Sequence, residues 1–197
     1  MHAQSLTRRA SLLLPFLLAA CGGGGGERTT FAPLHYEYLP AIPLNVAAID
    51  IELRFLPVRT GDVSASDPVN PVEALRGLAA DRLKPVSNKG RAVFSIRDAS
   101  LTMRGDQING AMEVTLEVLT DDGQHAGYAQ ARVRRVHTGR IENLRGTLYD
   151  MTSGMLDDMN VELEFQIRRN LKEWISTEVN AAPTPVEAAP LKDPFRR

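Results

Sequence analysis

Three segments of alternating hydrophobicity between residues 92 and 136, separated by two tight turns, constrain the fold of this chain more than any other feature. The turns are Gly105-Asp106 and Asp121-Asp122-Gly123, and glycine beside aspartate is typical of the turns that join antiparallel strands. The middle segment places its large apolar side chains on one face, namely Ile108, Met112, Val114, Leu116 and Val118. The three segments therefore predict an antiparallel meander with one buried face.

The first and last segments of this meander each add a detail. Between residues 92 and 103 the apolar parity changes near Asp98-Ala99, which predicts a β-bulge. Between residues 126 and 136 one face carries small side chains, which let a helix pack closely: Ala129, Ala131 and Val133. Because strand side chains alternate, the opposite and uncovered face carries Tyr128, Gln130, Arg132 and Arg134.

A strand and a helix precede the meander. Residues 45–55 alternate between apolar and charged side chains, as in a half-buried strand. Residues 70–73 (Asn-Pro-Val-Glu) then combine an N-cap residue, a proline at the first helical position and a glutamate at the third. The stripe that follows predicts a helix of about four turns that Pro85 ends; the stripe consists of Val72, Leu75, Leu78, Ala79 and Leu83.

The last predicted element is a long amphipathic helix over residues 143–178. Its apolar positions recur at spacings of three or four: Leu144, Leu148, Met151, Met155, Met159, Leu163, Ile167, Leu171 and Trp174. A helix of this length runs about 50 Å, longer than a four-stranded sheet, so we expect a bend near Gly154 or an overhang. We expect Leu148 and Leu163 to face the sheet, and the three methionines to be core rather than an adaptable contact stripe.

These elements occur in the order strand-helix-strand-strand-strand-helix over residues 45–179 and predict an α+β fold. The architecture expected is a two-layer sandwich, in which a four-stranded, mostly antiparallel sheet carries both helices on one face. Residues 180–197 are rich in proline and are predicted to be disordered. Residues 21–44 begin as a flexible glycine linker, but their aromatic part is too apolar to stay solvated, so we expect it to lie along the domain or a partner.

The beginning of the chain is typical of an export signal. Two arginines precede an apolar run over residues 12–20, which ends in the sequence Leu-Ala-Ala-Cys at residues 18–21 and is followed by five glycines. This arrangement resembles the lipobox of bacterial lipoprotein signals. The resemblance implies that residues 1–20 are removed as a signal peptide and that Cys21 is acylated. Two or three acyl chains, each methylene contributing about 0.8 kcal/mol, then hold the protein on a membrane.

Two other interpretations of this beginning are less consistent with the sequence. A membrane-spanning helix needs roughly 20 apolar residues, whereas this run contains Pro15 and ends in glycines. An ordinary secretory signal would leave an unpaired thiol on an exported protein. By the sorting rule of enteric lipoproteins, Gly22 after the cysteine favours the outer membrane over the inner one. We therefore expect a lipid-anchored protein of the cell envelope that faces the periplasm.

Charge and residue spacing argue against several classes of function. The whole chain has a net charge of −1, and loss of the two arginines in residues 1–20 makes it −3, so no basic footprint for nucleic acid is present. His35, His125 and His137 stand apart without metal-ligand spacing, and residues 121–124 form a turn rather than a calcium loop. The serines at 64, 66 and 100 lack the context of a nucleophile elbow. We predict no catalytic residue, metal or cofactor.

Acidic residues on the long helix are a weaker candidate site. Asp150, Asp157 and Asp158 are close enough in sequence to form one acidic patch, but a solvated helix face explains them better than a cation or catalytic site does. We therefore expect a solvated face.

The lipobox and the order of elements over residues 45–178 together resemble small envelope lipoproteins, such as the lipopolysaccharide-assembly lipoprotein and the auxiliary lipoproteins of ABC-type lipid transporters. The resemblance does not choose between a transport accessory, an assembly factor and a lone binding module. The anchor, the small α+β body and the absence of catalytic groups lead us to expect a non-enzymatic accessory or binding component in envelope assembly or lipid transport, with a protein partner. A cell-wall or lipid hydrolase and a small-molecule-binding lipoprotein are the alternatives. Tyrosine and arginine often dominate interfaces, so Tyr128, Arg132 and Arg134 are the candidate binding residues, against the alternative of a solvated face with cross-strand ion pairs.

Overall fold

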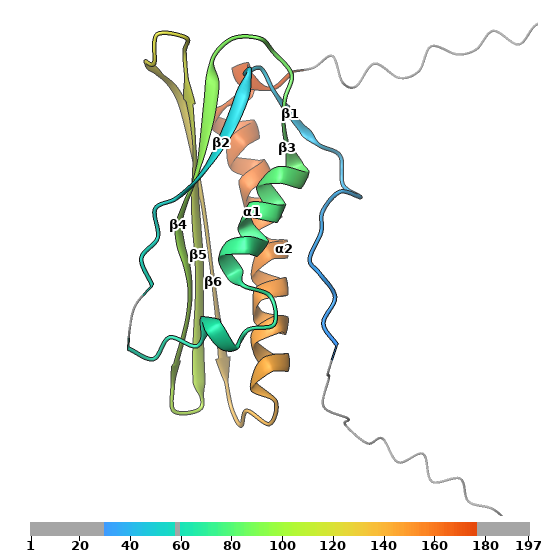
Figure 1. The fold of residues 1–197 in the computed structure, drawn as a ribbon, viewed down its shortest axis with the longest axis vertical. Coiled ribbons are helices and arrows are strands. Elements are labelled where there is room, and N and C mark those ends of the chain that lie inside the picture. The colour runs from blue at the N-terminus through green and yellow to red at the C-terminus, as the bar shows by residue number, and fades with distance from the viewer. Residues whose placement is uncertain (1–29, 58–59, 177–197) are drawn as a thin grey trace, which may run out of the picture.

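Four strands form the main sheet of the computed structural model, which describes residues 30–57 and 60–176. Their order across the sheet is β2 (Ala48–Leu53), β4 (Arg91–Arg104), β5 (Gln107–Leu119) and β6 (His125–Thr138). β2 runs parallel to β4, and the other two pairs are antiparallel. Two helices, α1 (Pro71–Arg82) and α2 (Leu144–Asn170), cover one face of this sheet (Figure 1). The predicted α+β sandwich is confirmed.

The meander follows its turn chemistry and its hydrophobic pattern. Gly105 and Gly123 adopt positive φ angles of 57° and 77°, a conformation that glycine adopts without steric cost. The pairing of β4 with β5 shifts register between Ile96 and Asp98, which confirms the bulge close to its predicted position. The apolar residues of β5 that were predicted to share the inner face are all fully buried, and they are Ile108, Met112, Val114, Leu116 and Val118.

Helix α1 begins as predicted and ends earlier than predicted. The side chain of Asn70 accepts hydrogen bonds from the backbone N–H groups of Val72 and Glu73. The helix ends at Arg82, and Leu83–Pro85 form the short strand β3, which pairs in parallel with β1 (Ile42–Leu44). Proline disfavours helical geometry in the residue before it, so this segment is extended and Leu83 is buried outside the helix.

Helix α2 is shorter than the predicted helix over residues 143–178. Asn143 caps it by accepting the N–H of Gly146, and 27 residues later the helix ends at Asn170. Lys172–Trp174 form a 3-10 turn (η2), and Ile175 pairs with Leu44. The helix is continuous through Gly154 and is about 40 Å long. The 13 or 14 residues of β4, β5 and β6 span about 45 Å, so the helix needs no overhang.

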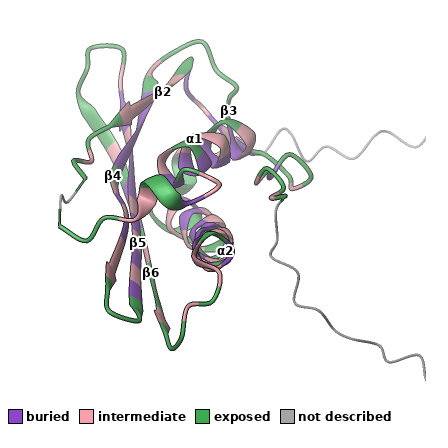
Figure 2. Cartoon of the chain, turned by 60° about the horizontal axis from the view of Figure 1, so that its bottom comes forward, coloured by how far each residue is buried: buried purple, intermediate pink, exposed green. Residues whose placement is uncertain are grey.

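The core lies between the sheet and the two helices, where Figure 2 shows buried residues on the facing surfaces. Leu148 and Leu163 are buried there, as predicted, and so are the three methionines, which are therefore core residues. Gly110 of β5 lets α2 approach, because a Cβ at this position would lie 2.7 Å from the sulfur of Met155. Among the described helices, none has the length and hydrophobicity to cross a membrane.

An irregular segment lies over the helices on the side away from the sheet. Residues 30–41, here called the strap, run along α1 and α2 and lead into β1 (Figure 1). The aromatic part of this segment thus lies along the domain, as the sequence predicted, and Tyr36 is buried. The strand β1 at its end was not predicted. The predicted signal peptide (1–20), Cys21 and the predicted disordered tail (180–197) lie outside the described residues.

Candidate functional site

The uncovered face of the sheet carries the three residues that the sequence singled out for binding. Tyr128, Arg132 and Arg134 lie on β6 and are exposed, whereas Ala129 and Ala131 between them are buried against the helices. Alternation along β6 therefore orients these residues as predicted. Their surroundings differ, and the outer face divides into two parts.

The first part, around Arg132, is a lattice of cross-strand contacts. The carboxylate of Glu113 on β5 accepts hydrogen bonds from Nε and Nη2 of Arg132 at 2.7 and 2.6 Å, and from the side-chain amide of Gln130 at 2.6 Å. Tyr128 lies two rows from Arg132 on the same face, opposite Glu117, and is half exposed. The charge of Arg132 is compensated, as in the solvated, ion-paired face that was the alternative to a binding surface.

The second part, around Arg134, is hollow. Ser100, Ala111 and Arg134 form one row across three strands, and the next row consists of Thr102, Asn109 and Val136. Since most of these side chains are small, they leave a shallow cavity of about 370 Å³ on this face, comparable in volume to small ligand sites. Arg134 is exposed and has no ion-pair or hydrogen-bond partner among the described residues. It borders this hollow as a cation whose charge is not compensated within the described part of the chain.

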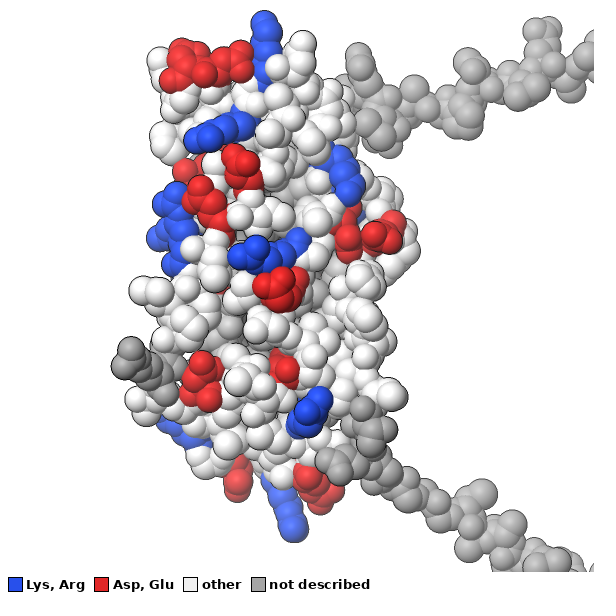
Figure 3. All heavy atoms as spheres, in the orientation of Figure 1, with Lys and Arg blue, Asp and Glu red and all other residues white. Residues whose placement is uncertain are grey.

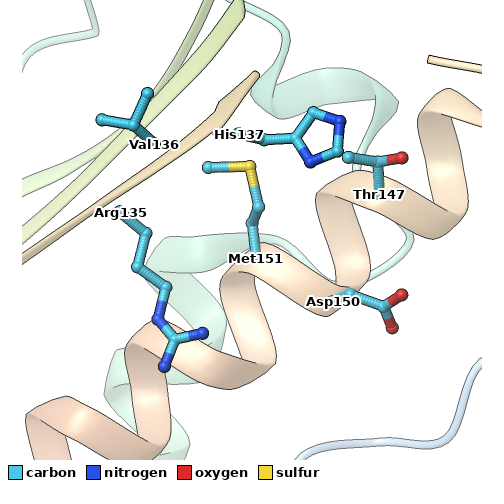
Figure 4. Close-up of a pocket in the computed structure, with 6 residues that line it drawn as sticks. All are labelled: Arg135, Val136, His137, Thr147, Asp150 and Met151. Carbon is cyan, nitrogen blue, oxygen red and sulfur yellow. The ribbon is translucent and has the colours of Figure 1, made fainter. Parts of the chain in front are cut away.

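A second cavity, of 430 Å³, lies on the other side of the same stretch of β6. It is a cleft between the end of β6 and the first turns of α2 (Figure 4). Its lining residues are Arg135, Val136, His137, Thr147, Asp150 and Met151. Within the described residues, the Nε2 atom of His137 is buried and has no hydrogen-bond partner. The cleft thus offers a polar atom and an apolar floor, Met151, to a side chain or small molecule that enters it.

Arg135 lines the cleft and connects β6 to α2. Its guanidinium contacts Asp158 of α2 through Nε at 3.0 Å and Nη2 at 2.9 Å. It also lies across Gly154, where a Cβ would come within 2.3 Å of Nη1. Gly154 therefore makes room for this arginine, which explains the glycine without the bend that the sequence suggested.

The strap enters the body at the same end of the molecule as the hollow and the cleft. Tyr149 near the start of α2 donates its hydroxyl to the carbonyl of Ala32 at 3.0 Å, and the ring of Phe31 lies 5.1 Å from its ring. The guanidinium of Arg145 lies 5.8 Å from the Phe31 ring, a cation-π distance. These contacts place the first described residues beside the start of α2.

Tyr36 fixes the middle of the strap to both helices. Its backbone N–H donates to Asp81 of α1 at 2.8 Å, and its hydroxyl donates to Asp157 of α2 at 2.6 Å. Burial, together with the hydrogen bond to the Asp157 carboxylate, raises the pKa of Tyr36 far above its ordinary value. The phenol is therefore a permanent donor at physiological pH.

The other candidates from the sequence do not converge on one site. His35 is on the strap, while His125 and His137 are at opposite ends of β6. Within the described residues, no group of three or more His, Cys, Asp or Glu residues is arranged to hold a metal ion. Asp157 and Asp158, expected to belong to a solvated face, bind Tyr36 and Arg135 respectively.

Sequence reasoning missed the cleft and the individual role of Arg134. One signal for the cleft was available, because His137 has the same parity on its strand as Ala131 and Val133 and so points toward the helices. No feature of the sequence indicates that Arg132 is ion-paired and Arg134 is not, because this depends on which residue of β5 lies opposite each arginine.

No known family model matches this sequence, and no curated protein matches it either. Among solved structures, the chain is similar to a lipoprotein of Caulobacter crescentus CB15 (TM-score 0.35, 12% identity, 57% of this chain and 86% of that chain). It is also similar to a minor lipoprotein of Acinetobacter baumannii (TM-score 0.34, 12% identity, 63% and 95%). A third is an uncharacterised lipoprotein B of Nitrosomonas europaea (TM-score 0.34, 14% identity, 64% and 86%). Similarity at this level carries no function over to this chain.

Proposed function

We propose that this protein is a lipoprotein anchored in the cell envelope through acylated Cys21, and that its folded body is a non-enzymatic accessory component that binds a partner at the membrane. The observation that carries the proposal is the sequence Leu-Ala-Ala-Cys at residues 18–21, which follows a basic and apolar leader and precedes five glycines. The body faces the periplasm, and the outer membrane is the favoured location. Envelope assembly and lipid transport are the processes that such an anchored binding module serves.

The position of the strap supports this arrangement. Nine peptide steps separate Cys21 from Thr30, and a chain spans at most about 3.3–3.6 Å per residue, or about 30 Å in all. Thr30 precedes the contacts of Phe31 and Ala32 with Tyr149. An anchor at Cys21 therefore keeps the end of the body that carries the start of α2, the hollow and the cleft near the membrane surface.

The division of the outer face supports a binding role for one part of it. Arg132 is compensated by Glu113, whereas Arg134 borders an open hollow without a partner among the described residues. A desolvated arginine is one of the side chains that most often dominate binding energy at interfaces. We assign partner binding to the part of the outer face around Arg134. Tyr128, six residues away on β6, is half exposed on the same face.

A small-molecule-binding role is a second candidate, and one observation favours it. The cleft beneath His137 has a volume of 430 Å³, within the range of about 300–1,000 Å³ typical of ligand pockets. It lies at the edge of the sandwich, because the space between the layers is filled by side chains such as Met155.

The anchor is tested by Cys21→Ser. The thiol is the acylation site, so the variant is expected to lose incorporation of labelled palmitate and to accumulate as an unprocessed precursor or a soluble periplasmic form. Membrane fractionation and immunoblotting of cells that express wild type and variant measure both. A variant of mature size that still fractionates with membranes contradicts the lipobox interpretation.

The accessory role is separated from the hydrolase alternative by purification of the native lipoprotein from membranes. A stoichiometric partner that is lost in Arg134→Glu and retained in Lys89→Glu, a charge reversal at an exposed residue elsewhere, is the expected result. Recovery of no stoichiometric partner, together with a hydrolytic activity that depends on one acidic residue or histidine, establishes the alternative.

A further inference from the structure

The two edges of the main sheet are protected very differently by the rest of the chain. On one edge, β2 pairs with the first half of β4, and residues 61–63 cover the second half. Val63 donates its N–H to Leu101 at 3.0 Å, and Met103 donates its N–H to Gly61 at 2.8 Å. On the other edge, the fourteen-residue strand β6 pairs with β5 alone within the described part of the chain. A long unpaired edge presents backbone N–H and C=O groups that pair readily with an additional strand.

The open edge has a cavity on each side of it. The hollow on the outer face and the cleft on the helix side are both lined by Arg135 and Val136. Because side chains of a strand point alternately to the two faces, a strand added beside these residues would direct one side chain into the hollow and its neighbours into the cleft. Strand-addition sites of this kind take affinity from the backbone ladder and specificity from pockets for alternate side chains.

Charge defines which side chain fits the hollow. β6 contains three arginines and neither Asp nor Glu. Glu113 compensates Arg132 and Asp158 compensates Arg135, so that Arg134, at the rim of the hollow, is the one arginine of this strand without a described partner. A carboxylate in the hollow pairs with it. On the helix side, the floor of the cleft is Met151, which suits an aliphatic side chain.

We propose that residues 133–137 of β6 bind an extended segment of a partner protein by strand addition, with an Asp or Glu of that segment in the hollow against Arg134 and flanking aliphatic residues in the cleft over Met151. This inference deepens the proposed function and rests on it for the compartment in which the partner is met. Peptide binding itself does not depend on acylation.

A second copy of this chain fits the edge less well. Its own β6 supplies no carboxylate. Its β2 supplies Asp50, in the row of Tyr128, and Glu52, in the row of Gln130. These rows lie six and four residues from Arg134 along the strand direction. Alignment of β2 with Arg134 would therefore displace each added copy by about 13–20 Å along the strands, away from a common membrane. A different protein therefore provides the segment.

The test uses the mature, full-length chain in detergent micelles and three synthetic pentapeptides. The probe is acetyl-TVEVT-amide, which places Glu on one face and the two valines on the other. One control replaces Glu with Lys, and the second carries N-methylated valines that cannot complete a ladder. Amide hydrogen exchange of the protein and peptide titration by NMR are the readouts. We expect the Glu peptide to slow exchange at residues 133–137 and to bind about fivefold or more tightly than the Lys peptide, as for a partly exposed ion pair.

Charge reversal of the protein provides the matched test. Arg134→Glu removes a side chain without a described partner, so the fold is retained, and the preference is expected to invert in favour of the Lys peptide. Lys89→Glu is expected to bind like wild type. Unchanged melting temperatures verify that both variants are folded.

Four outcomes overturn the proposal. The first two are equal binding of the Glu and Lys peptides and undiminished binding of the N-methylated peptide. The third is concentration-dependent protection of β6 in the free protein, which identifies a second copy as the occupant. The fourth is loss of β6 protection on removal of residues 177–197, which identifies the chain's own tail, where Glu187 lies between Val186 and Ala188. None of these outcomes bears on acylation, which Cys21→Ser tests separately.

Discussion

The two faces of the sheet are built from the same strands and carry opposite chemistry. On the inner face, apolar residues such as Phe94, Met112 and Leu116 are fully buried against the helices. On the outer face, Glu113 and Arg132 form an ion pair with roughly half of the arginine side chain exposed. Figure 3 shows, for one side of the molecule, acidic and basic side chains interleaved over the surface.

Because of this difference, the inner face contributes mainly to stability and the outer face is suited to recognition. Burial of apolar area stabilises by about 25 cal/mol per Å², whereas exposed ion pairs contribute about 0–1 kcal/mol. The inner face therefore supplies most of the folding free energy, and substitutions there are expected to unfold the protein. The outer face is free to vary without loss of the fold, which suits it to carry partner specificity.

The largest expected effect is on the inner side, at Leu148 and Leu163 of α2. Both are buried, so Leu148→Ala or Leu163→Ala is expected to lower the free energy of unfolding by about 2–5 kcal/mol. Urea denaturation measures this difference. Val161 of the same helix is 68% exposed, and Val161→Ala is the matched control with little expected effect. A loss below about 1 kcal/mol at both leucines would mean that the helix buries another stripe.

Larger side chains at two positions of β6 compare the inner and outer faces on a single strand. Ala131 of β6 is buried under α2, so Ala131→Leu is expected to cost about 1–3 kcal/mol, because the added methylene groups must displace well-packed neighbours. Arg134 points to the other side of the same strand, and Arg134→Leu is expected to change stability by less than about 0.5 kcal/mol. Thermal unfolding of the two variants compares the faces directly, and equal effects would remove the distinction.

The free energy of unfolding is expected to depend on pH through a buried polar contact of Asp67. Asp67 accepts the hydroxyl of Thr152 at 2.5 Å and the N–H of Val69 at 3.1 Å. Burial raises the pKa of Asp67 above its ordinary value of 3.8 in the folded state, although both hydrogen bonds oppose this shift. The folded protein therefore holds this proton more tightly than the unfolded chain does, and the stabilisation is lost as pH rises through the folded pKa.

The variant Asp67→Asn tests the direction of this pH dependence. The amide carries no charge. Its oxygen can accept the N–H of Val69, and its NH2 group can donate to the hydroxyl oxygen of Thr152 instead of accepting from it. The variant is therefore expected to gain stability relative to wild type as pH increases from about 4 to 7, by up to about 1 kcal/mol. Unfolding curves at several pH values measure the difference. Asp62→Asn, an exposed residue of the same loop, is the control. A difference that shrinks with rising pH contradicts the assignment.

The smallest effect on stability is expected on the outer face. Tyr128→Ala combined with Arg132→Ala removes a half-exposed ring and an exposed ion pair, which together are expected to change the free energy of unfolding by less than about 1 kcal/mol. Function in cells is expected to be impaired if this part of the face binds the partner. Normal function at normal protein levels would eliminate Tyr128 and Arg132 and leave Arg134 as the candidate.

Local sequence was sufficient for the elements whose pattern is short-range. Asn70 caps its helix as its position predicted, and the parity change near Asp98 marked the bulge in β4. These features depend on alternation, on helical periodicity and on the hydrogen-bonding capacity of single side chains, all of which are properties of neighbouring residues.

The register between β5 and β6 does not follow from local sequence. At the turn, Leu119 lies opposite His125, and pairing counted from there would place Glu113 opposite Ala131. A shift between Val118 and Leu119 instead places Glu113 opposite Arg132. This single-residue shift compensates Arg132 and leaves Arg134 beside the hollow, so the candidate site depends on an irregularity that the sequence does not signal.

The sequence alone determined the meander, the cap of α1, the inner and outer faces of β5 and β6 and the resemblance to a lipoprotein signal at Cys21. The tertiary structure decided where α2 ends, because Ile175 leaves the helical region to pair with Leu44. It also decided the course of the strap, which Tyr36 joins to Asp81 and Asp157, and the cleft between β6 and α2. The physical reason is the same in each case: these features are contacts between segments distant in sequence, whose formation depends on how the finished layers pack rather than on the preference of any one segment.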